Sequence, residues 1–166
     1  LQQLACLGNS AEFAMLDMIY QDSREEMHVQ LWEAVRTGLV FRAEAYYRFL
    51  HDRVQEAAYS LIPEELRAEA HLRIGRLLAE HTPPERLEEG IFEIVNQLNR
   101  GSHLVTSNEE RERVAELNFI AGKRAKISTA YASALRLLAA GRALLTEETW
   151  DCNYDLIFSI EYLMAE

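Results

Sequence analysis

The segment 46–62 constrains the fold most, because the period of its hydrophobic residues changes in the middle. Tyr47 and Phe49 alternate with polar neighbours, which is the two-residue period of a strand. Beyond Asp52 the apolar residues recur at the spacing of one helix face: Val54, Ala57, Ala58 and Leu61. Asp52 is also a favourable N-cap residue type. We therefore expect the chain to pass from a strand into a helix at His51 and Asp52.

Helical patterns precede this segment. Residues 1–20 contain two short helical patterns, of which the second is expected to start at Ser10. A third helix is expected to begin near Ser23, because Glu26 three residues later fits a capping box. Two β-rich runs predict a hairpin: 39–41 and 46–49. Three helices, a hairpin and a following helix predict a winged-helix-like module over residues 1–62.

From residue 63 onward the sequence shows only helix signals. Gly90 lies inside one predicted helix, where glycine costs about 1 kcal/mol relative to alanine, so a close helix contact is expected there. Several residues between 108 and 145 have the spacing of tetratricopeptide packing positions: Gly122, Tyr131, Ala134, Leu138 and Gly141. An ordinary antiparallel helical pair is the alternative. Because each repeat buries its face on the next, we expect 63–166 to be a tetratricopeptide-like region that starts a longer array. The predicted fold class is mainly α.

Charge and hydropathy limit the classes of function. The chain carries 17 Lys and Arg against 27 Asp and Glu, a formal charge of −10, whereas nucleic-acid binders need a basic face. No apolar run approaches the roughly 20 residues of a membrane span, and no signal peptide is recognisable at Leu1. We expect a piece of a longer cytoplasmic protein. Cys6 and Cys152 could form one disulfide, but small buried apolar residues in a reducing compartment are the favoured interpretation.

Sequence motifs for catalysis or metal binding are not recognisable. The chain has no phosphate-binding loop, no dinucleotide fingerprint and no nucleophile elbow. None of the five histidines has a cysteine or histidine partner at metal-ligand spacing. Paired glutamates such as Glu25-Glu26 fit the first turns of helices better than acid–base chemistry. We expect no catalytic residue, no metal site and no enzymatic activity in this chain by itself.

The junction motif, Phe49-Leu-His-Asp52 followed by the helix face described above, resembles the Met/Leu-His-Asp motif in the winged-helix domain of STAND-type signalling ATPases. In that superfamily the motif lies at the same strand-to-helix junction. Residues 48–63 look particularly like the ATPase segment of large bacterial multidomain regulators. Those proteins join a kinase-like region, a P-loop ATPase, helical repeats and often GAF and sensor histidine-kinase modules. Two later stretches, 70–78 and 94–101, are similar to the same family, and the resemblance is strongest over 46–101.

The resemblance implies a role for His51. In STAND ATPases the equivalent histidine contacts the phosphate of bound ADP and helps to hold a closed, inactive arrangement, and an imidazole can donate a hydrogen bond to a phosphate oxygen. Asp52 would cap the following helix and orient the loop. This chain lacks the phosphate loop and the metal-binding acids. The resemblance therefore implies that ADP or ATP with Mg binds to a neighbouring P-loop ATPase domain of the same protein.

Three functions remain open at this point. The first is a regulatory and scaffold segment of a bacterial signalling ATPase that acts in a two-component system. The partners of this segment would be the adjacent ATPase domain and a protein bound by the helical repeats. The second is a winged-helix DNA-binding regulator with a helical dimerisation tail. Three glutamates beside two arginines in the predicted recognition helix 23–37 disfavour it. The third is a free-standing helical binding module, in which His51 is only the polar end of a strand.

Overall fold

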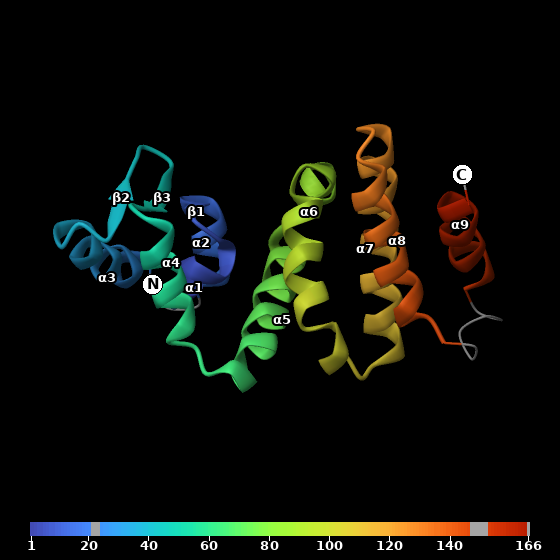
Figure 1. Ribbon diagram of the computed structural model, residues 1–166, viewed down its shortest axis with the longest axis horizontal. Coiled ribbons are helices and arrows are strands. Elements are labelled where there is room, and N and C mark those ends of the chain that lie inside the picture. The colour runs from blue at the N-terminus through green and yellow to red at the C-terminus, as the bar shows by residue number, and fades with distance from the viewer. Residues whose placement is uncertain (21–23, 147–152, 166) are drawn as a thin grey trace. The chain divides into compact units, whose positions relative to one another are not determined.

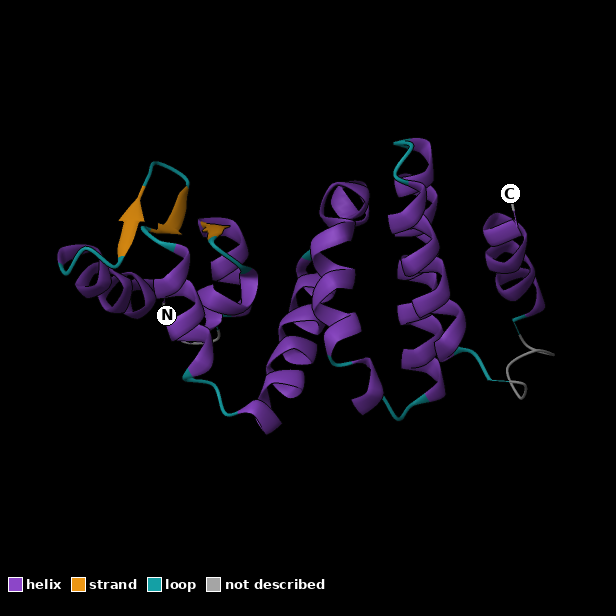
Figure 2. Cartoon of the chain, viewed as in Figure 1, coloured by secondary structure: helices purple, strands orange, loops and turns teal. Residues whose placement is uncertain are grey.

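The computed structural model describes residues 1–20, 24–146 and 153–165, and the chain is mainly helical with one small antiparallel sheet (Figure 1, Figure 2). Its contacts divide it into two compact units, Leu1–His81 and Thr82–Glu166. The predicted fold class, a mainly α chain with a small β-hairpin followed by a helical array, is confirmed.

The first unit holds the sheet and the helices around it. Its elements in chain order are α1 (Gln2–Leu7), β1 (Ser10–Glu12), α2 (Phe13–Ile19), α3 (Arg24–Arg36), β2 (Val40–Arg42), β3 (Tyr46–Phe49), α4 (Asp52–Ser60) and α5 (Glu64–His81). The strand order is β1-β3-β2, with both pairings antiparallel, so β3 is the central strand. The predicted hairpin is therefore present as β2 and β3.

Strand β1 was not expected from the sequence. The predicted helix start at Ser10 is wrong, because Ser10 begins a strand in which Ala11 pairs with Tyr47, and the helix begins only at Phe13. Pairing with β3 satisfies the backbone of this segment and buries Ala11. A strand of three residues is too short to show a period of its own. The predicted capping box at Ser23 lies outside the described residues.

The sheet of the first unit has one buried and one exposed face. Along β3, Tyr47 and Phe49 are buried while Tyr46 and Arg48 are exposed, as the two-residue period predicts. Helix α1 contacts α4, α2 contacts α5 and α3 contacts β2. The largest side chains of this core come from both the helices and the strands: Leu4, Leu16, Ile19, Met27, Tyr47, Phe49 and Ile74.

Helix α4 buries a face that matches the predicted one only in part, because Ala58 is buried and Val54 half-buried as predicted, but Ala57 and Leu61 are exposed. Ala58 and Ile62 are buried, whereas Leu61 is 68% exposed. The Gln55 side chain donates a hydrogen bond to the Ala5 carbonyl oxygen at 2.9 Å, which fixes the side of α4 that faces α1. The i, i+3, i+4, i+7 spacing also fits residues 55, 58, 59 and 62. The contact with α1 determines that this face packs against the core.

The two-unit division falls between α5 and α6, whereas the sequence predicts a domain boundary at 62–63, ahead of α5. Helix α2 contacts α5, so the contacts of α5 belong to the first unit. A boundary at 62–63 stays a prediction about where an independently folding domain ends.

The second unit is helical throughout its described residues. It contains α6 (Pro84–Arg100), a short 3-10 turn η1 (Ser102–Leu104), α7 (Asn108–Ile127), α8 (Tyr131–Leu144) and α9 (Tyr154–Ala165). Helix α7 packs against α6 and α8, and α8 packs against α9. Thr129, with a positive φ of 61°, turns the chain between α7 and α8. The Ser107 hydroxyl caps α7 by accepting a hydrogen bond from the Glu110 N–H at 3.4 Å.

Two glycines let α7 and α8 approach closely. A Cβ atom added to Gly122 would lie 2.7 Å from Cγ and Cδ2 of Leu138, and one added to Gly141 would lie 3.1 Å from the Ala115 carbonyl oxygen. Gly122, Leu138, Gly141 and Ala134 are buried, as tetratricopeptide-like packing positions require. Tyr131, in contrast, is 64% exposed.

Gly90 differs from these two glycines. A close helix contact was predicted there, and that prediction is wrong, because a Cβ atom at Gly90 would meet no atom of the described residues within 4 Å. Glycine in a helix therefore does not by itself indicate a close contact. Only the positions where another helix lies against the backbone require the missing side chain.

These two kinds of glycine predict opposite effects of the same substitution. We expect Gly122→Ala to lower the free energy of unfolding by about 1–2 kcal/mol, because an overpacking cost of about 1–3 kcal/mol is partly offset by the better helix propensity of alanine. Gly90→Ala is the matched control and is expected to stabilise the chain by up to about 1 kcal/mol. Urea unfolding followed by circular dichroism measures both. Equal effects of the two substitutions would contradict the close approach of α7 and α8.

Candidate functional site

The residues between β3 and α4 form the candidate site, because the structure places the predicted residue His51 there. The backbone on both sides is tied down. The Phe49 N–H donates to the Asn9 carbonyl oxygen at 2.9 Å, and the Leu50 N–H donates to the Leu39 carbonyl oxygen at 3.1 Å. The backbone of this junction is thus held by segments that lie before β1 and before β2.

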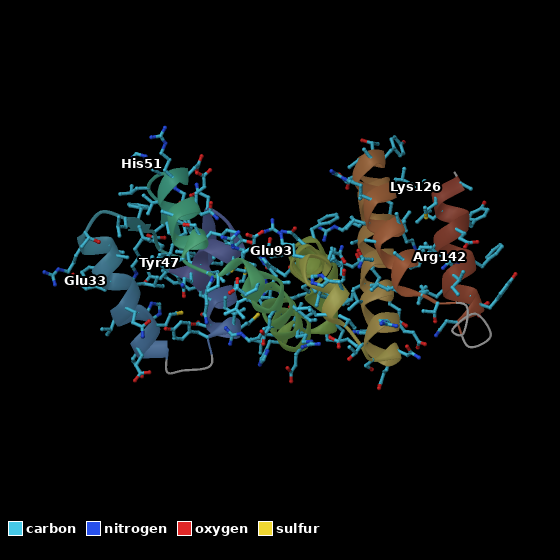
Figure 3. The ribbon with its side chains drawn as sticks, turned by 60° about the horizontal axis from the view of Figure 1, so that its bottom comes forward. Glu33, Tyr47, His51, Glu93, Lys126 and Arg142 are labelled. Carbon is cyan, nitrogen blue, oxygen red and sulfur yellow. The ribbon has the colours of Figure 1, made fainter. Side chains whose placement is uncertain are left out.

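His51 itself is the N-cap residue of α4, with φ −141° and ψ 142°, and its carbonyl oxygen accepts the first helical hydrogen bond from the Val54 N–H at 2.9 Å. Its side chain is exposed and makes no capping hydrogen bond. Figure 3 shows His51 at the periphery of the first unit, near the start of α4. The fold therefore fixes the backbone of His51 and leaves the imidazole accessible to a ligand.

Asp52 does not occupy the predicted position. The prediction that Asp52 caps the helix is wrong, because the first helical hydrogen bond ends on the carbonyl of His51, which makes Asp52 the first residue of the helix. Its exposed carboxylate lies in the first turn, where negative charge complements the helix dipole. An orienting role of Asp52 toward a ligand stays a prediction.

The surface next to His51 combines charged and apolar side chains. Arg48 and Arg53 are exposed on either side of it in the sequence, and Leu50 is 45% exposed. Other apolar side chains of the β2 region are also exposed: Leu39 and Phe41. Exposed apolar residues beside cationic groups suit contact with another domain that carries an anionic ligand.

Two further histidines of the first unit serve its packing. The Nδ1 atom of His28 shares a hydrogen bond of 2.9 Å with the hydroxyl group of buried Tyr47, and Phe13 packs against both rings. The Arg42 guanidinium lies 5.4 Å from the centre of the Phe13 ring. Burial raises the pKa of the Tyr47 hydroxyl above its ordinary value, and the charge of Arg42 opposes part of that rise.

His71 is the more deeply buried of these histidines, with 1% of its surface exposed. Its Nε2 atom shares a hydrogen bond of 2.9 Å with the Tyr59 hydroxyl, and the Arg67 guanidinium lies 5.0 Å from the centre of the Tyr59 ring. The sequence contains a signal for this burial. His71 lies three residues before buried Ile74, on the same face of α5.

Other candidate chemistry is limited. Within the described ranges, no group of three or more His, Cys, Asp or Glu side chains is arranged to hold a metal ion. Cys6 is buried, as predicted, and Cys152 lies outside the described residues. A search of the described helices finds none with the length and apolar character of a membrane span.

Comparisons with known proteins give one informative similarity. No family model and no solved structure matches the chain. The hybrid signal transduction histidine kinase G of Dictyostelium discoideum is 30% identical over 138 residues, which cover 69% of this chain. The chain spans only 4% of the length of that relative. It is therefore similar to a short segment of a large signalling protein.

The contrast between His51 and His71 predicts different effects of truncation on stability. We expect His51→Ala to change the free energy of unfolding by less than about 0.5 kcal/mol, because the side chain is exposed and caps nothing. The matched substitution His71→Ala should cost about 2 kcal/mol or more, because it leaves a cavity and removes the partner of Tyr59. Urea unfolding measures both values. A loss above about 1 kcal/mol for His51→Ala would assign that imidazole a structural role.

Proposed function

We propose that this chain is a non-catalytic regulatory segment of a multidomain signalling ATPase. In this proposal the first unit is a winged-helix module that forms one wall of a nucleotide site on a neighbouring P-loop domain. His51 donates a hydrogen bond from its imidazole to a phosphate oxygen of the bound ADP. The helical region passes the nucleotide state onward or binds a partner protein.

The proposal rests on one observation, which is that His51 combines a fixed backbone with an accessible imidazole. Its backbone is fixed between hydrogen-bonded neighbours, its side chain is exposed, and no capping bond uses the imidazole. A histidine kept only for stability would be expected to bond within the fold, as His71 does with Tyr59. A fixed backbone with an accessible imidazole is the arrangement that a phosphate contact from outside requires.

The order of elements supports the winged-helix part of the proposal. The first unit runs helix, strand, helix, helix, strand, strand, and the strand order β1-β3-β2 places the last strand in the centre. The Leu50-His51-Asp52 motif lies where β3 gives way to α4, which is the position that the resemblance to STAND ATPases implies. The start of α4 also adds the positive end of a helix dipole to this place.

The nucleotide and its metal belong to the neighbouring domain in this proposal. ADP or ATP with Mg binds there, and this chain supplies His51 and the basic side chains of Arg48 and Arg53. The relative's name describes a hybrid signal transduction histidine kinase, which supports a signalling protein as the parent. We infer that the parent protein combines ATPase and kinase modules and acts in the cytoplasm.

DNA binding is the alternative function that the surface of α3 disfavours. In a winged-helix DNA-binding protein, this helix would enter the major groove. Its exposed residues include the acidic Glu25, Glu26 and Glu33, of which Figure 3 labels Glu33. Val29 and Trp32 on the same helix are 72% and 50% exposed. The exposed glutamates repel a phosphate backbone, and the exposed apolar side chains suit contact with a protein.

The nucleotide contact is tested by ADP affinity in a longer form of the protein that includes the neighbouring ATPase domain. We expect His51→Ala to weaken ADP binding by about tenfold to a hundredfold, because a charge-assisted hydrogen bond contributes about 1.5–3 kcal/mol. The exposed His103 of the second unit provides the matched control, and His103→Ala should leave the affinity unchanged. Isothermal titration calorimetry measures both. Equal affinity of His51→Ala and the wild type would favour a helical binding module without a nucleotide connection.

A further inference from the structure

A groove with a volume of about 470 Å³ lies between α6 and α8 in the second unit. Asn96 and Arg100 line it from α6, and Arg136 lines it from α8. Apolar side chains complete the lining on both helices: Phe92, Val95 and Leu137. The groove thus combines cationic and amide groups with an apolar surface that is large enough for more than a single small ion.

The charge of this groove is opposite to that of the chain. The chain has a formal charge of −10, yet among the described residues the lining includes two arginines and no carboxylate. Helix α8 contains no Asp or Glu, and the glutamates of α6 all lie at or before Glu93, ahead of Asn96 and Arg100. A local cationic groove on an acidic protein attracts an anionic partner to this one place.

The floor of the groove is rigidly built. Asn99, another lining residue, donates from its side-chain amide to Oδ1 of Asn118 at 2.8 Å, and Asn118 donates back to Oδ1 of Asn99 at 2.9 Å. Asn118 is fully buried and also donates to the Val114 carbonyl oxygen at 2.9 Å. This amide pair joins α6 to α7 and holds the α6 side of the groove in a fixed place.

A hydrogen-bonded guanidinium lies beside this floor. The Nη2 atom of Arg136 donates to the hydroxyl group of Ser133, another lining residue, at 3.0 Å, which holds the guanidinium beside the groove.

We propose that this groove binds an extended acidic peptide segment that carries one bulky apolar side chain. Arg100 and Arg136 bind the carboxylates, because the planar guanidinium matches a carboxylate with two parallel hydrogen bonds. The apolar side chain of the peptide packs against Phe92, Val95 and Leu137. The apolar lining selects a peptide over inorganic phosphate. This inference rests on the protein-binding role proposed above for the helical region and names the chemistry of its partner.

Binding of a defined probe to the 166-residue chain tests this proposal. The probe is a fluorescein-labelled peptide with two glutamates on each side of one leucine. Fluorescence anisotropy at low salt measures the affinity of the chain for this peptide. We expect Arg136→Gln to weaken binding about tenfold, which is the effect of losing one charge-assisted contact. Arg113→Gln is the matched control, because Arg113 is exposed on α7 and pairs with Glu116 at 3.2 Å. It should change the affinity by less than about twofold.

Four results would overturn the proposal. The first three are no binding of the acidic probe to the wild type, equal losses in the two arginine variants, and equal affinity for a probe with serine in place of leucine. Inorganic phosphate that competes as well as the probe would also overturn it, because the groove would then be a simple anion site. Arg136 is exposed, so circular dichroism of Arg136→Gln should match the wild type. The ADP affinity of the longer protein does not involve Arg136, so failure of this proposal and failure of the nucleotide contact are distinguishable.

Discussion

The pairing of β3 with strands on both sides is the constraint on which the first unit depends. Ala11 of β1 and Arg42 of β2 both pair with Tyr47, so the central strand has hydrogen-bonding neighbours on each edge. The same strand buries Tyr47 and Phe49 in the core. Because β3 is fixed on both edges, the residues that follow it leave the sheet at a fixed place. That constraint presents His51 at the start of α4 with an accessible side chain.

The second unit depends on close packing rather than on strand pairing. Gly122 and Gly141 remove side chains where α7 and α8 meet, so the two backbones lie closer than larger residues would allow. The amide pair of Asn99 and Asn118 then fixes α6 against α7. One face of α8 packs closely against α7. Arg136 lies on another face of α8 and lines the groove between α6 and α8. One unit thus presents an imidazole and the other a cationic groove, each on a rigid support.

Local patterns in the sequence predicted the hairpin, the strand-to-helix junction and the small residues between α7 and α8, because each depends on neighbours within a few positions. Features that depend on distant partners were missed. Strand β1 exists through its pairing with β3, and the buried face of α4 is selected by α1, which exposes Leu61. Residue type alone is a misleading signal at two positions. Asp52 is a good cap type yet follows the N-cap, and Gly90 has no close neighbour although it lies in a helix.

Hydrogen exchange in the longer protein tests whether the junction of β3 and α4 faces the nucleotide of a neighbouring ATPase domain. The N–H groups of Asp52 and Arg53 precede the first helical hydrogen bond, which the Val54 N–H donates. We expect saturating ADP to slow the exchange of these two N–H groups at least about tenfold, because the closed nucleotide site excludes water, and to leave the exchange of α7 unchanged. Equal exchange rates at Asp52 and Arg53 with and without ADP would show that this junction does not face the nucleotide.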